Sequence, residues 1–166
     1  MPVATNLGLA KKGLSAAPVQ QGGLPTIDEM LAIWVSFDKA AADGAAGTAT
    51  TDTIVWMNPY NVPVYFVSGL AIGLGAGIVA DAANFATITF RSIDLAGGAS
   101  AAALTLATDL AGGSWTSNQS KAITALTKAN AAIPVGGGIS FSIAKSGTGV
   151  VVPISKYLLK LFKAES

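Results

Sequence analysis

Between residue 52 and the C-terminus, apolar and polar residues alternate in short stretches separated by glycine, proline, asparagine and aspartate. Alternation with a period of two places successive side chains on opposite faces of a strand, and strands bounded by such turn residues are typical of β-sandwiches and barrels. The stretches that we expect to form strands are 53–57, 62–66, 85–93, 101–108, 139–145 and 150–162. With a further polar strand or short helix within 120–132, the pattern predicts an all-β, jelly-roll-like sandwich or barrel.

The first 25 residues follow a different pattern. Their apolar residues are scattered among small polar ones, proline and glycine interrupt them, and no helical or strand period is sustained. We therefore expect an extended N-terminal arm over 1–25, a short helix or edge strand with a linker over 26–51, and one β-sandwich domain over 52–166.

Two segments fit a helix as well as a strand. Thr26 and Glu29 have the spacing of a helix capping box, and the apolar residues that follow, up to Lys39, recur at helical spacing, so a short amphipathic helix is the first interpretation of 26–39. The same segment also alternates as an edge strand would. Near the C-terminus, the lysines of 156–163 are spaced by about four residues, which suits a terminal helix, and a terminal strand competes with it.

The segment 62–80 consists of nineteen uncharged residues, with glycines at the Gly-x-x-x-Gly spacing of close-packed membrane helices. Against a membrane span, Pro63 lies inside the segment, its first half alternates like a strand, and no lysine or arginine flanks it within ten residues. We instead expect two buried strands joined by a turn near Ser68–Gly69. The later glycines would allow close packing around a symmetry axis: Gly73, Gly75 and Gly77.

Charged residues form 11% of the chain and hydrophobic residues 51%, and the mean hydropathy is +0.55. Much of the surface must therefore consist of small neutral side chains, which suits a subunit that stays in contact with other subunits. The net charge is +1, from ten basic and nine acidic residues spread along the chain without a basic stripe for a phosphate backbone. Nucleic acid is therefore not an expected partner.

The sequence contains no histidine and no cysteine. This removes Ser-His-Asp triads, imidazole metal ligands, zinc–thiolate sites and thiol nucleophiles, so we expect a protein that is not an enzyme and has no catalytic residue, metal site or cofactor. Three aspartates beside turn residues are interpreted as turn formers rather than calcium ligands: Asp81, Asp94 and Asp109. The three tryptophans are interpreted as anchors of the core or of an interface: Trp34, Trp56 and Trp115.

Three stretches of the chain together resemble a known family. The segment 133–161 runs from a glycine-rich turn and a strand through Ser-Gly-Thr-Gly and a proline to a last apolar strand, and 54–66 and 86–94 are similar to the opening strands of the same kind of domain. The chain resembles the capsid decoration, or cement, proteins of tailed bacteriophages, and more loosely their head-fibre proteins. This resemblance implies a jelly-roll-like domain, usually trimeric, that sits where major capsid subunits meet and clamps them with an extended N-terminal arm.

The function that follows is that of a non-enzymatic virion protein, which binds the outer capsid surface and stabilises the shell as a symmetric oligomer, a homotrimer. Its expected partners are the major capsid protein and further copies of itself, without a small-molecule substrate. Because Met1–Ala10 lacks the features of a secretory signal, we expect it to be made in the host cytoplasm and to end in the virion. The arm residues assigned to capsid binding are Leu7, Leu9, Lys11, Lys12 and Leu14. The residues assigned to an oligomer interface are Trp34, Gly73, Gly75 and Gly77.

Two other functions stay open at this stage. An exposed Trp115 or Tyr60 could stack on a host glycan, as in the receptor-binding module of a phage fibre. A small membrane protein would instead span the bilayer with residues 62–80.

Overall fold

The computed structural model of the chain describes residues 32–39, 52–147 and 150–164. The fold reported below is that of the unit Ile33–Ser166. Its described residues form ten strands and one short 3-10 helix, η1 (Lys128–Asn130), which confirms the prediction of an all-β protein.

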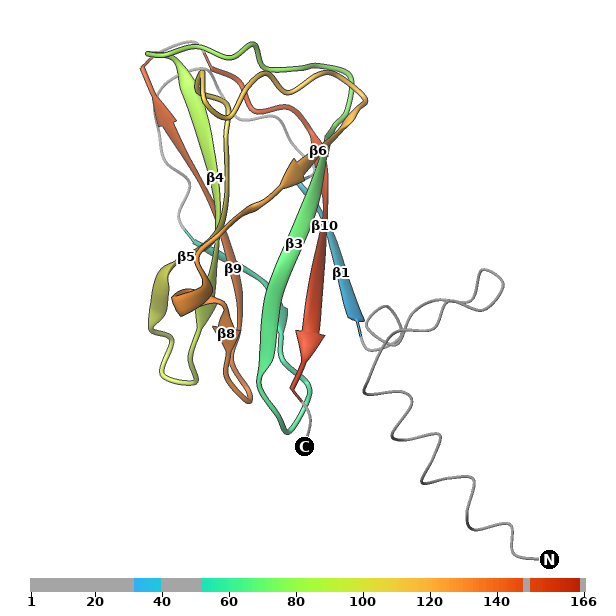
Figure 1. Cartoon of the computed structure of the whole chain (residues 1–166), viewed down its shortest axis with the longest axis vertical. Coiled ribbons are helices and arrows are strands. Elements are labelled where there is room, and N and C mark those ends of the chain that lie inside the picture. Colours follow the sequence, from blue (N-terminus) through green and yellow to red (C-terminus); the bar gives the residue numbers. More distant parts are fainter. Residues whose placement is uncertain (1–31, 40–51, 148–149, 165–166) are drawn as a thin grey trace, which may run out of the picture. The chain divides into compact units, whose positions relative to one another are not determined.

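The strands form two antiparallel sheets that face each other across the core (Figure 1). The first, named the β10 sheet, has the order β1 (Ala32–Lys39), β10 (Ser155–Lys163), β3 (Val64–Gly73) and β6 (Ser120–Ile123), with β8 (Ala132–Ile133) paired to β3. The second, named the β4 sheet, has the order β2 (Thr53–Met57), β9 (Gly138–Ser146), β4 (Phe85–Ile93), β5 (Ala99–Ala107) and β7 (Ala125–Leu126).

The strand order is that of a jelly roll. Without the two-residue strands β7 and β8, the sheets have the orders 1-10-3-6 and 2-9-4-5, which form a two-sheet sandwich of Greek keys. Every connection between consecutive strands passes from one sheet to the other, except the connection between β4 and β5. The last strand, β10, lies between β1 and β3. The predicted jelly-roll-like sandwich is therefore confirmed.

Residues Ala32–Lys39 form the strand β1 at one end of the β10 sheet. The interpretation of 26–39 as a helix is therefore wrong for these residues, and the edge-strand alternative is confirmed. Alternate apolar residues from Ile33 to Phe37 pack toward the core, whereas Trp34 is exposed, and only a strand separates them onto two faces in this way. Residues 26–31, with the proposed capping box, lie outside the described residues.

The turn predicted near Ser68–Gly69 is wrong, because β3 runs through this point from Val64 to Gly73. The register with β10 shifts here, since Lys160 lies opposite Ser68 but Leu161 lies opposite Phe66. The extra residue, Val67, is a β-bulge, and it moves the buried positions of β3 from even to odd numbers. In the sequence, the switch of apolar positions from even to odd residues resembles two strands joined by a turn. In the structure, the bulge produces this switch within the single strand β3.

Four other predicted strands agree with the structure to within two residues, namely 53–57, 85–93, 101–108 and 139–145, whereas the predicted strand 150–162 begins too early, because β10 starts at Ser155. β4 spans the predicted 85–93, and β9 extends the predicted 139–145 by one residue at each end. The C-terminal segment forms β10, so the strand alternative holds there and the terminal helix does not. Among the described residues, no helix has the length and apolar character needed to cross a membrane.

The core between the sheets is centred on Tyr157 of β10. Its ring stacks on Phe37 at a centroid distance of 5.0 Å and contacts Phe141 at 5.1 Å and Phe90 at 5.7 Å. Trp115, in the connection between β5 and β6, extends this cluster at 6.3 Å from the Tyr157 ring. Aromatic pairs at these distances add to the stabilisation from apolar burial, so the cluster ties strands of both sheets together.

Candidate binding surface

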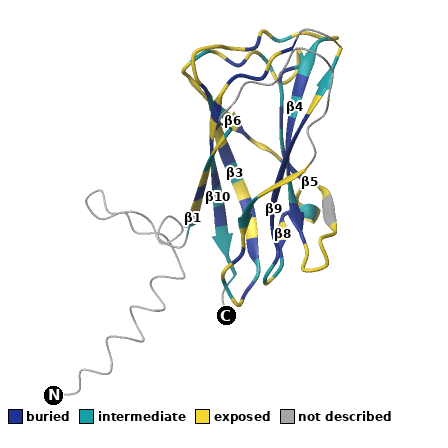
Figure 2. Cartoon of the chain, turned by 180° about the vertical axis from the view of Figure 1, so that it is seen from behind, coloured by how far each residue is buried: buried dark blue, intermediate teal, exposed yellow. Residues whose placement is uncertain are grey.

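The side of the β10 sheet that points away from the core carries mainly apolar side chains. Tyr157, Leu159 and Leu161 are buried, so the residues between them on β10 point outward, and β3 and β1 alternate similarly (Figure 2). These outward side chains are named the outer face: Trp34, Ser36 and Asp38 of β1; Tyr65, Val67, Leu70 and Ile72 of β3; Ala122 of β6; and Lys156, Leu158, Lys160 and Phe162 of β10.

Strand pairing brings apolar residues from distant parts of the chain together at the centre of the outer face. Leu158 lies opposite Leu70, and Lys156 lies opposite Ile72. With Ser36 of β1, these residues line a groove of about 150 Å³. Leu70 is 38% exposed and Trp34 is 53% exposed. A contiguous set of large apolar side chains in contact with water is typical of a binding surface, whereas single exposed ones are not.

Three charged side chains surround this apolar centre. Lys156 Nζ lies 3.6 Å from Asp38 Oδ1, and both side chains are more than half exposed, so the ion pair adds little stability. Lys160 Nζ lies 5.8 Å from the centroid of the Trp34 ring and has no carboxylate partner among the described residues. With two lysines and one aspartate, the outer face has a net charge of +1.

The outward side of the β4 sheet has a different character. Its central positions hold small hydroxyl side chains: Thr87, Thr89, Thr105, Ser140 and Ser142. Arg91 crosses this side and donates hydrogen bonds to Asp52 Oδ1 at 2.7 Å and to Ser142 Oγ at 2.6 Å. The apolar centre of an interface is better matched by the outer face of the β10 sheet than by this polar side.

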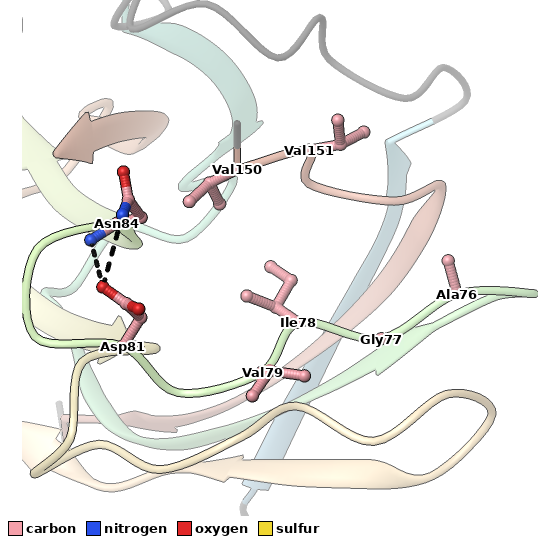
Figure 3. A pocket seen from close by; sticks show the side chains of 8 residues that line it. All are labelled: Ala76, Gly77, Ile78, Val79, Asp81, Asn84, Val150 and Val151. Carbon is pink, nitrogen blue, oxygen red and sulfur yellow. Dashed lines mark hydrogen bonds between the residues drawn. The ribbon is translucent and has the colours of Figure 1, made fainter. Parts of the chain in front are cut away.

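A pocket of about 410 Å³ lies among the loops that follow β3 and precede β10 (Figure 3). Most of its lining is apolar, and its one acidic group is Asp81, which accepts backbone N–H bonds from Ala83 at 2.7 Å and from Asn84 at 2.6 Å. These hydrogen bonds, chiefly that from Asn84, lower the pKa of Asp81. The carboxylate therefore holds its own loop.

The other two predicted turn formers behave in the same way. Asp94 accepts a bond from the backbone N–H of Ala96, and Asp109 accepts one from Gly112. The interpretation of the three aspartates as turn formers is confirmed. Within the described ranges, no group of three His, Cys, Asp or Glu side chains comes together as a metal site.

Lys121 of β6 lines a second pocket of about 410 Å³ beside β5. Its ammonium group donates to the backbone carbonyls of Gly112, Gly113 and Ser114. Partial burial lowers the pKa of Lys121, and the charge of Asp109 opposes this shift. Because an ammonium group has three donors, these carbonyls engage all of them, and the lysine fastens the loop after β5.

The glycines assigned to an oligomer interface each have a structural reason within one chain. A Cβ atom on Gly77 would lie 2.5 Å from the Trp115 carbonyl oxygen, because Ile78 and Trp115 form a β-bridge at this point. A Cβ on Gly73 would lie 3.3 Å from the Trp115 ring, and Gly75 has a φ of +79°. Their role in an interface between chains stays a prediction.

The remaining assigned residues divide into two groups. Trp34 lies on the outer face, and the arm residues Leu7, Leu9, Lys11, Lys12 and Leu14 lie outside the described residues. Local sequence patterns do not single out the other apolar residues of the outer face: Tyr65, Val67, Leu70, Ile72, Leu158 and Phe162. The sequence of β10 does indicate such a surface, because the strand is apolar on both faces apart from its lysines. A strand of this kind is expected to be covered on both sides.

Of the two residues expected to stack on a glycan, Trp115 and Tyr60, the structure excludes Trp115. Trp115 is 1% exposed and belongs to the core, so the expectation that it stacks on a sugar is wrong. Tyr60 packs against the core, and Lys163 Nζ lies 5.2 Å from the centroid of its ring.

The fold and its surfaces define a jelly-roll domain with one apolar outer face. No protein-family model and no curated protein matches the sequence. Among solved structures, a chain in the structure of infectious bursal disease virus, Gx strain, is distantly similar, with a TM-score of 0.33 and 16% sequence identity. The match covers 88% of this chain and 36% of the viral chain, so this chain spans about a third of the length of the other. So distant a likeness leaves the function to be inferred from the molecule itself.

Proposed function

We propose that this chain is a non-enzymatic structural protein of a virion, which binds the outer surface of the capsid and stabilises the shell as a symmetric oligomer. The arm over 1–25 and the sandwich would both contact the shell. Many weak contacts from several symmetric copies would add by avidity, so the shell would be stabilised without any chemical step.

The outer face of the β10 sheet is the observation that carries this proposal. It presents Trp34, Leu70 and Leu158 to solvent around an apolar groove, as a protein-binding surface does. Jelly rolls occur in viral capsid domains, in lectins and in cupins, so the fold alone does not select a function. The resemblance of 54–66, 86–94 and 133–161 to capsid decoration proteins supports a capsid as the partner.

The proposal is tested by mixing the full chain with shells assembled from the major capsid protein of the same virus. We expect the chain to sediment with the shells, to saturate them, and to raise the temperature at which they break open. Light scattering on the unbound chain should give the mass of a trimer. Failure to sediment with intact shells at saturating concentration would contradict the proposed function.

Removing residues 1–25 tests the contribution of the arm. We expect the truncated chain to keep its oligomeric mass and its β-sheet circular dichroism spectrum but to lose shell binding, because the apolar anchors and Lys11 and Lys12 are gone. A full-length variant with serine at positions 7, 9 and 14 controls for the change in length. If both variants bind shells as tightly as the wild type does, residues 1–25 do not contribute to binding and this part of the proposal is wrong.

A further inference from the structure

We infer that the outer face of the β10 sheet docks on a protein surface that is apolar at its centre and carries carboxylates around it. This inference rests on the proposed function, in which that surface belongs to the major capsid protein. Trp34 and the groove beside Leu70 and Leu158 would bind its apolar centre. Lys160 would bind one of its carboxylates.

The size of the outer face fits one half of a protein–protein interface. Its three long strands have eight to ten residues each. At about 3.3 Å per residue and about 4.8 Å between strands, they cover roughly 30 Å by 15 Å, or about 450 Å². A stable interface buries about 800 Å² on each partner. The outer face thus supplies more than half of the area needed.

Charge favours an acidic partner over a second copy of this chain. Lys160 has no carboxylate partner among the described residues, and Lys156 has only the exposed Asp38. A symmetric contact between two outer faces would bring together two surfaces that each carry a net charge of +1, and like charges oppose such a contact. Residues 1–25 contain two lysines and no acidic residue, so the sequence of this segment has the same sign of charge as the outer face. The charge of both therefore favours an acidic partner.

The outer face is also preformed. β10 pairs with β3 from Ser155 to Lys163, and Tyr157 anchors β10 in the aromatic core. Side chains that project from paired strands lose little backbone entropy on binding, so a modest area can give useful affinity.

Two substitutions on the outer face, each with a matched control elsewhere, test this inference with the full chain. Trp34→Ser removes the apolar anchor, and Leu95→Ser removes an apolar side chain that is 79% exposed in the β4–β5 connection. Lys160→Glu reverses a charge on the outer face, and Lys128→Glu reverses one on the exposed η1 helix. Circular dichroism and thermal unfolding establish that all four variants are folded.

Shell binding is measured by sedimentation at several salt concentrations. Loss of an exposed aromatic anchor at a hot spot weakens a protein interface by about thirtyfold, and that is the effect expected for Trp34→Ser. Reversal of the exposed charge of Lys160 should weaken binding by about tenfold at low salt and by less at high salt. Both controls should bind like the wild type.

Three results would overturn the inference, and they are distinguishable. If the wild type binds shells and both outer-face variants bind equally well, the outer face is not the docking surface and the proposed function survives. If the variants lower the oligomeric mass in light scattering without weakening shell binding, the outer face joins copies of this chain. If the wild type itself does not bind shells, the proposed function fails, and this inference fails with it.

Discussion

The substitution Gly77→Ala tests whether the glycines after β3 serve the fold of one chain or a contact between chains. A Cβ at this position would lie 2.5 Å from the Trp115 carbonyl oxygen and 2.9 Å from the Ser117 backbone nitrogen. Ordinary contact distances for carbon begin at about 3.5 Å, so the backbone must move by about 1 Å. Both atoms are main-chain atoms beside the bridge in which Ile78 and Trp115 exchange two hydrogen bonds of 2.8 Å.

The expected loss of unfolding free energy follows from this geometry. Added carbon atoms in packed sites cost about 1–3 kcal/mol, and a contact with backbone cannot be relieved by a side-chain rotation, so we expect about 3 kcal/mol for Gly77→Ala. Gly75→Ala is the matched control. It has open space around its Cβ and only a φ of +79° to strain it, so we expect about 1 kcal/mol there.

Urea unfolding of the wild type and both variants measures these losses. Tryptophan fluorescence is a suitable probe because Trp115 is buried beside the substituted residue. The measurements need several protein concentrations, since association of folded chains raises the apparent stability. Light scattering on the same samples gives the oligomeric mass.

Either of two results would refute the reasoning. An unfolding free energy of Gly77→Ala within about 0.5 kcal/mol of the wild type would show that the close approach to Trp115 is not a constraint. A lower oligomeric mass at unchanged stability would assign the glycine to an interface between chains.

Two further predictions concern a buried indole and an exposed carboxylate. Trp115 Nε1 is buried without a hydrogen-bond partner in the described part of the chain. Trp115→Phe should therefore cost less than about 1.5 kcal/mol in urea unfolding, against about 3–5 kcal/mol for Trp115→Ala, and equal losses for the two variants would contradict this prediction. Hydrogen bonds from Asn84 and Ala83 lower the pKa of Asp81, so its ionised form is favoured in the folded state. This contribution is present above the ordinary value of 3.8 and is lost as the pH falls through the lower folded value, so the stability difference between wild type and Asp81→Ala should shrink in acid and not at neutral pH. A difference that persists at the lowest pH would contradict it.

Local patterns in the sequence predict the strands whose two faces differ most. β4 and β9 alternate apolar and polar residues, and their predicted bounds match the structure to within one residue. β1 shows why other elements could not be predicted alone. Its apolar residues fit a helix or a strand, and the choice is made by pairing with β10, more than a hundred residues later. In β3 the bulge at Val67 exchanges the residues that face the core for those that face outward. A turn between two strands gives the same pattern of apolar residues, so the sequence alone does not distinguish the two.

The outer face could be predicted only in part for the same reason. The residue type of Trp34 predicts a role at an oligomer interface, which stays a prediction, and the structure shows only that Trp34 lies exposed on this surface. Leu70 and Leu158 become neighbours only through the register between β3 and β10, which no local pattern specifies. The spacing of the lysines in 156–163 suits a helix, but the strand places Lys156 and Lys160 on one side together with Leu158 and Phe162, and these apolar residues change what the surface can bind.

The central position of β10 also constrains how the cell can make this protein. β1 and β3 are connected in the sheet only through β10, which is synthesised after all the other described strands. Nearly every connection also crosses between the sheets, so neither sheet can be completed from one continuous part of the chain. Folding must therefore wait for the synthesis of β10, and until then the growing chain exposes unpaired apolar strands. A ribosome that stops shortly before codon 155 would release a chain that lacks the centre of one sheet, which is a substrate for chaperones and proteases rather than a shorter version of the subunit.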